Sequence, residues 1–199
     1  MKVLEEDYSE ILDSTAIKYI HTTNNATKRM SSLIKSLLNF SRLGHNTKLV
    51  YSDCGQIVTN VLDDLHTLIK DSNAIIEVLE MPILNVFEIE INQVFQNLIT
   101  NAIKFRRENT QPIIKISSEK IKNTWKFLVS DNGIGIDPVH FEKIFEIFQR
   151  LDTKGKYEGS GIGLANCKKI IQLHRGEIWI ESTLGEGSTF YFTIPASIV

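Results

Sequence analysis

Two amides and an ammonium group recur along one predicted helix, from 93 to 105. Asn97, Asn101 and Lys104 stand at i, i+4 and i+7, so they share one face of that helix. Carboxamide oxygens are hard ligands that suit Mg²⁺, and a lysine ammonium is a point charge that suits phosphate. A solvated polar face is the alternative interpretation, and this segment alone does not separate the two.

Two glycine-rich segments could add backbone chemistry. The segment 131–136 follows a predicted strand, and Gly133 and Gly135 permit a close approach that side chains would block. Asp131, at the end of the strand, can accept a hydrogen bond from an exocyclic amine such as that of adenine, although an ordinary turn would also fit. The segment 159–163 opens a predicted helix, and bare backbone N–H groups at a helix start bind phosphate oxygens.

The elements that must position these residues alternate along the chain after residue 44. Apolar periodicity predicts helices at 53–69, 89–106 and 164–174, and strands at 48–51, 74–79, 113–118, 125–130, 177–181 and 189–194. We therefore expect an α+β fold, a two-layer sandwich in which one mixed sheet is covered by helices on one face.

The first 44 residues have a different texture. A helical stripe of apolar residues runs from Ile17 to Leu43 and ends at Gly44, while the segment 4–11 resembles the tail of another helix. We expect residues 1–44 to form a partial helical hairpin and residues 45–199 to form a second domain. Such an arm cannot bury its stripe alone, so a partner chain is expected.

Composition excludes several classes of protein. The 199 residues carry a net charge of −2, with 22 Lys and Arg scattered among 24 Asp and Glu, so nucleic acid is not an expected partner. No apolar run approaches the roughly 20 residues of a membrane span, and no signal peptide opens the chain, which favours the cytoplasm. Cys54 and Cys167 have neither metal-ligand nor disulfide-scaffold spacing and are expected to be ordinary buried thiols.

Taken together, these motifs resemble the histidine-kinase branch of the GHKL superfamily of ATPases, which also includes gyrase, the Hsp90 chaperones and the mismatch-repair ATPases. The resemblance extends to residues 141–148, which look like the phenylalanine box of that family, and to residues 185–190, its final glycine motif. Five motifs follow one another in the family's order between about residues 49 and 195. The stretch 145–151 is especially similar to kinases attached to phytochrome and similar sensory modules.

The resemblance implies a role for each matching residue. Asn101 would bind Mg²⁺, Asn97 and Lys104 would be the catalytic residues on the phosphate side, and Asp131 would hold the adenine amine of ATP. Residues 145–160 would form a mobile lid. The remaining nucleotide contacts would be Phe105, Gly133, Gly135, Ile136, Phe145, Arg150, Gly159, Ser160, Gly161, Ile162, Gly163, Leu164 and, through its hydroxyl, Thr189.

Position 97 separates the branches of the superfamily by their chemistry. Hydrolytic members place a glutamate one turn before the metal-binding asparagine, where it activates water, and this chain has Asn97 there. An amide cannot act as a general base. Phosphoryl transfer to a side chain is therefore favoured over a hydrolytic ATPase, which remains the weaker alternative.

The N-terminal hairpin resembles the family's dimerisation module. Residues 26–42 match its second helix, whereas the first helix, which carries the phosphoacceptor histidine, is mostly absent. His21 lies on the second helix and lacks the acceptor context, so it is interpreted as an ordinary helix residue. We expect a fragment of a homodimeric protein-histidine kinase whose acceptor helix and response regulator lie elsewhere; a non-transferring ATP- or ADP-binding module is the alternative. Phe87 departs from the family, which often has a capping Asp there.

Overall fold

The computed structural model describes residues 12–44, 48–151 and 160–196. The chain divides into two compact units, Met1–Arg42 and Leu43–Val199. Helix α2, Ser14–Arg42, makes up most of the described part of the first unit. The Asp13 carboxylate accepts a hydrogen bond from the Ala16 N–H at 2.7 Å and so caps this helix. The predicted helix tail at 4–11 lies outside the described residues.

The apolar stripe of α2 is not buried by the helix's own unit. Four of its large side chains are between 45% and 60% exposed: Met30, Ile34, Leu37 and Leu38. The polar gap within the stripe is satisfied locally, because the hydroxyls of Thr22 and Thr23 donate to the carbonyls of Lys18 and Tyr19. The stability of such a helix depends on packing along its apolar face, which the described residues of this unit leave largely uncovered.

A five-stranded sheet forms one layer of the second unit. Its order is β2-β4-β5-β7-β6, and the strands span Ile75–Val78, Ile113–Ile121, Thr124–Asp131, Gly187–Pro195 and Ile178–Thr183. The β2–β4 pair is parallel and the other pairs are antiparallel. A separate antiparallel ribbon joins β1, Val50–Asp53, to β3, Ile83–Val86.

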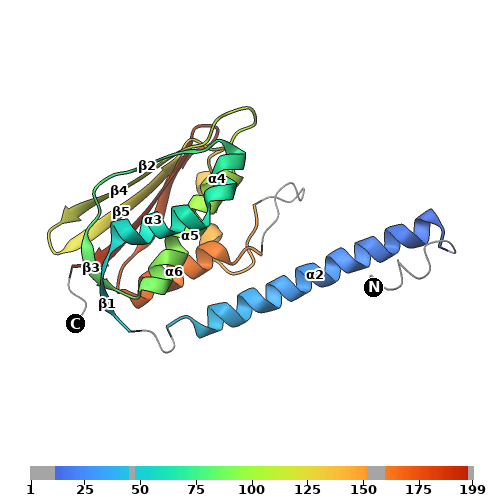
Figure 1. Cartoon of the computed structure of the whole chain (residues 1–199), viewed down its shortest axis with the longest axis horizontal. Helices are drawn as coiled ribbons and strands as arrows, with labels where there is room; N and C mark the ends of the chain where they lie inside the picture. Colours follow the sequence, from blue (N-terminus) through green and yellow to red (C-terminus); the bar gives the residue numbers. More distant parts are fainter. Residues whose placement is uncertain (1–11, 45–47, 152–159, 197–199) are drawn as a thin grey trace. The chain divides into compact units, whose positions relative to one another are not determined.

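Helices cover one face of this sheet (Figure 1). They are α3, Cys54–Asp64, α4, His66–Ser72, α5, Glu88–Lys104, and α6, Gly163–Leu173. The predicted two-layer α+β sandwich with a mixed sheet is thereby confirmed. The single helix predicted over 53–69 is wrong in one respect, because the chain turns at Leu65 between α3 and α4. The strand β3 was not predicted.

Three aromatic rings fix α5 against the sheet. Phe127 of β5 and Phe192 of β7 stack with centroids 4.7 Å apart, and Phe95 of α5 meets both rings edge-on, at 6.2 and 5.6 Å. All three side chains are fully buried. Edge-to-face pairs of this kind add roughly 0.5–1.5 kcal/mol beyond the area they bury. The cluster therefore fixes the rotation of α5, with its amide-bearing face turned away from the sheet.

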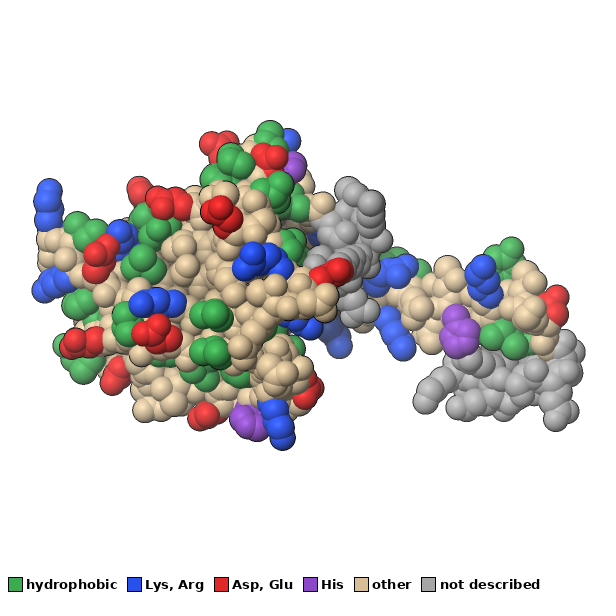
Figure 2. Space-filling view, turned by 90° about the horizontal axis from the view of Figure 1, so that it is seen from above, with side chains coloured by type: hydrophobic (Ala, Val, Ile, Leu, Met, Phe, Trp, Pro, Cys, Tyr) green, Lys and Arg blue, Asp and Glu red, His purple; other side chains and the backbone are tan. Residues whose placement is uncertain are grey.

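Acidic and basic side chains are interspersed over the visible face of the molecule, without a large area of one sign (Figure 2). Among the described residues, no helix is both long enough and apolar enough to cross a membrane.

Candidate nucleotide site

The amide face of α5 meets the glycine-rich start of α6. A Cβ placed on Gly163 would lie 3.1 Å from Asn97 Oδ1, so the two helices approach closely here and a side chain at residue 163 would press on the amide. Asn97 Nδ2 is buried and has no hydrogen-bond partner of ordinary geometry among the described residues. The Cys167 thiol beside this amide is only a weak acceptor. A buried amide donor without a good partner is costly, at roughly 1–3 kcal/mol, unless a ligand or water satisfies it.

The start of α6 presents bare backbone N–H groups. Its N-cap residue is Ile162, which is buried and supplies no side-chain acceptor. The first helical N–H groups therefore have no partner from their own cap, which is the arrangement that binds phosphate. The predicted phosphate role of the segment 159–163 thus has a physical basis for its described part, from Ser160 onward, while Gly159 lies outside the described residues.

The loop 132–136 is bonded to the other end of α5. The Ile134 N–H donates to the Phe105 carbonyl at 3.0 Å. A Cβ on Gly133 would lie 2.6 Å from that same carbonyl oxygen, so this contact requires glycine. Lys104 Nζ lies 4.5 Å from the centroid of the Phe105 ring, a cation–π distance. Asn97, Asn101 and Lys104 thus run along α5 from the start of α6 toward this loop.

Asp131 ends β5 with its carboxylate largely enclosed. Asp131 Oδ1 accepts a hydrogen bond from the Gly133 N–H at 2.8 Å. Burial raises the pKa of Asp131 above its usual value, and hydrogen bonds from the backbone N–H groups of Gly133 and Ser188 only partly offset this. A ligand amine that donates to the carboxylate would recover part of the desolvation cost. The geometry is therefore suited to the predicted adenine contact.

The hydroxyl that the structure places beside Asp131 differs from the Thr189 hydroxyl predicted to support the adenine pocket. Thr189 pairs with Ser130 and donates to its hydroxyl at 2.9 Å, one residue out of step with Asp131. Because successive strand residues face opposite sides of a sheet, Thr189 and Asp131 project to opposite faces. Ser188 pairs directly with Asp131 and lies on the buried face. Ser188 Oγ is also 2.9 Å from Ser182 Oγ, so a pair of hydroxyls adjoins Asp131 on that face.

The final glycine motif and the loop 132–136 are held together by backbone contacts. Gly135 has φ +68°, and a Cβ there would lie 2.1 Å from the Thr183 carbonyl oxygen. The Ile136 N–H donates to the Ser182 hydroxyl at 2.8 Å, and the Gly185 N–H donates to the Ile134 carbonyl at 2.7 Å. Gly135 and Ile136, two of the predicted nucleotide contacts, are therefore held against the end of β6.

Arg107 is a positioning residue that sequence reasoning missed. Its Nε donates to the Asn132 carbonyl at 3.0 Å and its Nη1 donates to the Gly185 carbonyl at 3.2 Å. One guanidinium thus links the end of α5 to the loop 132–136 and to the final glycine motif at 185–190. No motif or spacing marks this arginine in the sequence, because its partners are backbone carbonyls that are remote along the chain.

The phenylalanine box packs beneath the start of α6. It lies around two short 3₁₀ turns, Pro138–His140 and Lys143–Phe145, and Phe145 is buried with its ring edge-on to Phe190 at 6.5 Å. The Phe148 N–H donates to the Gly161 carbonyl at 2.9 Å. Gly161 has φ +71°, and a Cβ there would lie 2.8 Å from the Gln149 carbonyl oxygen.

The remaining predicted contacts are placed less centrally. Ser160 and Leu164 are half-buried at the start of α6, and Arg150 is exposed. The predicted lid falls partly on residues 152–159, which lie outside the described residues. The two cysteines are buried as expected, and burial raises the pKa of each thiol to about 12, so neither is a nucleophile at neutral pH.

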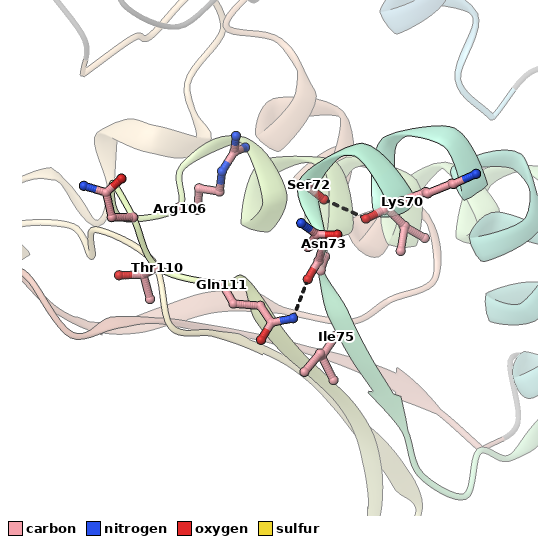
Figure 3. A pocket seen from close by; sticks show the side chains of 10 residues that line it. Lys70, Ser72, Asn73, Ile75, Arg106, Thr110 and Gln111 are labelled. Atoms are coloured by element: carbon pink, nitrogen blue, oxygen red, sulfur yellow. Dashed lines mark hydrogen bonds between the residues drawn. The ribbon is translucent and has the colours of Figure 1, made fainter.

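A larger hollow of about 640 Å³ lies elsewhere, between the end of α4, the start of β2 and the loop after α5. Its two cationic side chains, Lys70 and Arg106, point in different directions rather than toward a common centre (Figure 3). A hydrogen bond of 2.9 Å from Gln111 Nε2 to the Asn73 carbonyl crosses its floor. Without converging polar groups, this hollow is a weaker candidate than the α5–α6 site.

Comparison with known proteins agrees with the observed fold. Residues 87–198 match the family described as histidine kinase-, DNA gyrase B- and HSP90-like ATPase. The chain is 46% identical to phytochrome-like protein Cph1 of Synechocystis sp., over 98% of this chain and 26% of that protein. The chain thus spans about a quarter of the length of this protein and of two similar cyanobacterial phytochromes.

Two solved structures show the same architecture. Histidine kinase ThkA in complex with response regulator protein TrrA aligns with a TM-score of 0.71 and 27% identity, over 94% of this chain and 54% of that one. Full-length ShkA in complex with AMPPNP aligns with a TM-score of 0.74 over 96% of this chain and 41% of that one, and at 23% identity this likeness concerns the fold alone. The chain therefore belongs to the family of histidine kinase-, DNA gyrase B- and HSP90-like ATPases, as a catalytic ATP-binding domain of the histidine-kinase type.

Proposed function

We propose that this chain binds ATP·Mg²⁺ as the catalytic part of a sensor histidine kinase. In this proposal the γ-phosphoryl group moves to a histidine on a dimerisation helix of the parent protein, and from there to an aspartate of a response regulator. The cytoplasm, where ATP and response regulators occur, is the compartment in which such a domain would act.

One observation carries the proposal. Asn97 Nδ2 is a buried donor without a good partner among the described residues, and it belongs to the amide that faces the bare start of α6. A phosphate oxygen held by the first N–H groups of α6 would lie beside this amide and could accept its hydrogen bond. The cost of this weakly paired donor would then be recovered when the nucleotide binds.

The donors present fit Mg²⁺ held mainly by the nucleotide. No group of three or more His, Cys, Asp or Glu side chains that could hold a metal is found among the described residues. Mg²⁺ commonly keeps several waters and takes substrate phosphates with only one or two protein oxygens. The Asn101 carboxamide oxygen would be that protein ligand. When bound, the ion would neutralise the charge on the phosphate oxygens.

The same residues favour transfer over hydrolysis. Asn97 occupies the position from which a general base would activate water, and an amide does not accept a proton at neutral pH. Positioning of a nucleophile supplied by another segment then becomes the main contribution of the domain. The complex that ThkA forms with TrrA supports a response regulator as the downstream partner of such kinases.

The exposed stripe of α2 supports a role in dimerisation. Four large apolar side chains on this one helix are at least 45% exposed: Met30, Ile34, Leu37 and Leu38. A cluster of exposed apolar side chains of this kind is typical of a protein–protein contact surface. A second copy of the helix, together with the acceptor helix of the parent, would cover it as in a four-helix bundle.

The direct test uses γ-labelled ATP with this chain and a polypeptide that contains the parent's acceptor helix. We expect acid-labile, alkali-stable label on the added polypeptide. ATP binding without label on that polypeptide would support the non-transferring module instead, and rapid release of inorganic phosphate would support a hydrolytic ATPase. Absence of ATP binding would contradict all three functions.

A further inference from the structure

A buried imidazole joins α5 and α6 at the ends remote from the proposed nucleotide site. His174 is fully buried and is the residue at which α6 ends. Its Nε2 accepts a hydrogen bond from the Phe87 N–H at 3.0 Å, and its Nδ1 lies 2.8 Å from the Ile170 carbonyl oxygen. A carbonyl only accepts hydrogen bonds, so Nδ1 carries the proton and the neutral Nε2 is the acceptor.

This contact supplies a cap that α5 lacks. Phe87 is the N-cap residue of α5 and offers no side-chain acceptor. In a capping box, a residue three positions later in the same helix would accept the N–H of the cap residue. Here the acceptor comes from the end of a different helix. The His174 ring also packs edge-on against the Phe87 ring, with centroids 5.0 Å apart, which fixes the orientation of the imidazole.

The two helices consequently touch at two fixed points. At one end Phe87 meets His174, and at the other Asn97 meets Gly163. At 1.5 Å per residue the points are about 15 Å apart along α5 and about 16.5 Å apart along α6, and the helices run antiparallel. A slide of α6 along α5 would break the imidazole contact and would also move the start of α6 away from the Asn97 amide.

We propose that His174 is a positioning residue for the nucleotide. It keeps α5 and α6 in the axial register in which the Asn97 amide and the first N–H groups of α6 can face the same phosphate. Nothing in this role requires His174 to touch the ligand. The inference rests on ATP binding at the α5–α6 site, which is part of the proposed function.

Two substitutions separate positioning from general stability. His174→Phe keeps a ring of similar size but has no acceptor for the Phe87 N–H, whereas His174→Gln retains an acceptor oxygen near the Nε2 position. Ile116→Val in β4 serves as a control that loses buried volume without touching α5 or α6 through a hydrogen bond. ATP affinity is measured by calorimetry at a temperature at which each variant is folded, as judged by its thermal unfolding curve.

We expect His174→Phe to weaken ATP binding by about five-fold, which is the affinity ratio that corresponds to the free energy of one helix cap. His174→Gln should restore most of the affinity, and Ile116→Val should bind ATP as the wild type does although it is less stable. Equal affinity of His174→Phe and wild type would overturn the inference, as would equal loss in the Phe and Gln variants. Wild-type protein that fails to bind ATP would instead refute the proposed function.

A measurement on the wild type covers the case in which His174→Phe does not fold. Coupling is reciprocal, so a contact that favours ATP binding must be strengthened when ATP is bound. Amide hydrogen exchange at Phe87 should therefore slow several-fold on addition of ATP·Mg²⁺. Unchanged exchange at Phe87, with slowing at the start of α6, would overturn the coupling between the two ends.

Discussion

Asn97 and Gly163 face each other so closely that a methyl group on Gly163 would come within 3.1 Å of the Asn97 amide oxygen. Gly163→Ala should therefore displace the amide and weaken ATP binding, on the order of ten-fold. The stability of the fold should change little, because the preference of a helix for alanine over glycine, roughly 0.5–1 kcal/mol, offsets part of the cost of displacing the amide. Calorimetry with ATP·Mg²⁺ and thermal unfolding measure the two effects.

A matched control for this variant exists in the chain. A Cβ on Gly55, in the first turn of α3, would also lie 3.1 Å from a side-chain oxygen, that of Asp53. Gly55→Ala should leave ATP affinity unchanged. Equal affinity of Gly163→Ala and wild type would show that Asn97 does not need its present position to bind the nucleotide.

Asn101→Ala should abolish the Mg²⁺-dependent part of ATP binding while the fold stays intact. The substitution removes the proposed oxygen ligand and places a good helix former in α5, so its cost to the helix is small. ATP affinity measured with and without Mg²⁺ tests this expectation. Gln96→Ala, at an exposed position of the same helix, is the control. A variant that retained the wild-type gain from Mg²⁺ would remove Asn101 from the metal role.

Asp131→Asn should stabilise the free protein at neutral pH and weaken its binding of adenine nucleotides. Burial raises the pKa of Asp131 in the folded state, so the stability it contributes is present below the unfolded pKa and is lost as pH rises through the folded one. An asparagine at this position does not ionise, so the loss of stability with rising pH disappears. It also lacks the negative charge, so the proposed hydrogen bond to the adenine amine loses its charge assistance, worth roughly 1.5–3 kcal/mol. Urea unfolding at pH 4 and pH 7, and titration with ATP and ADP, check both halves. Unchanged ADP affinity would show that Asp131 does not hold the adenine.

His174 should make the fold sensitive to mild acid. Burial lowers its pKa from the usual value near 6.5, although the bond to the Ile170 carbonyl opposes this. With a depressed folded pKa, the stabilising contribution is complete above the unfolded pKa and is lost as pH falls from about 6.5 toward the folded value. The unfolding free energy of the wild type should therefore fall more steeply between pH 7 and pH 5 than that of His174→Gln. Identical slopes would contradict the assignment of a neutral imidazole.

The chain by itself should bind ATP without forming a stable phosphohistidine and without rapid hydrolysis. Transfer requires an acceptor nitrogen in line with the γ-phosphate, and His21 on α2 has no acceptor context in the sequence. Incubation with γ-labelled ATP, followed by acid and alkali treatment, distinguishes the outcomes. Alkali-stable label on His21 would show that this histidine is an acceptor after all.

The shared face of the predicted site residues on α5 could be predicted from the sequence, because it depends on spacing along a single element. Asn97, Asn101 and Lys104 share a face because of helix periodicity alone. The glycines in the loops likewise predict close contacts between backbone segments. Alternation along β7 would also have placed Ser188, rather than Thr189, beside Asp131, since Ser188 has the parity of the buried Phe190 and Phe192.

What escaped prediction depends on contacts between distant segments. The break at Leu65 is invisible because Leu65, Leu68 and Ile69 continue the apolar spacing of α3 without a glycine or proline. The strand β3 is only four residues long and directly follows Pro82. The contacts of Arg107 and His174 end on backbone groups that no residue type in the sequence identifies.

The parallel pairing of β2 with β4 has a kinetic consequence. Parallel neighbours cannot be joined by a hairpin, and here the connecting chain passes through β3 and the whole of α5. Closing this long loop costs conformational entropy before any contact between the two strands forms, so such a pairing is slow to form. The helix that carries Asn97 and Asn101 is thus part of the crossover between β2 and β4, so the edge strand β2 pairs with the sheet only when this connection is closed. One segment thus carries the predicted nucleotide contacts and also forms the long connection on which the edge pairing depends.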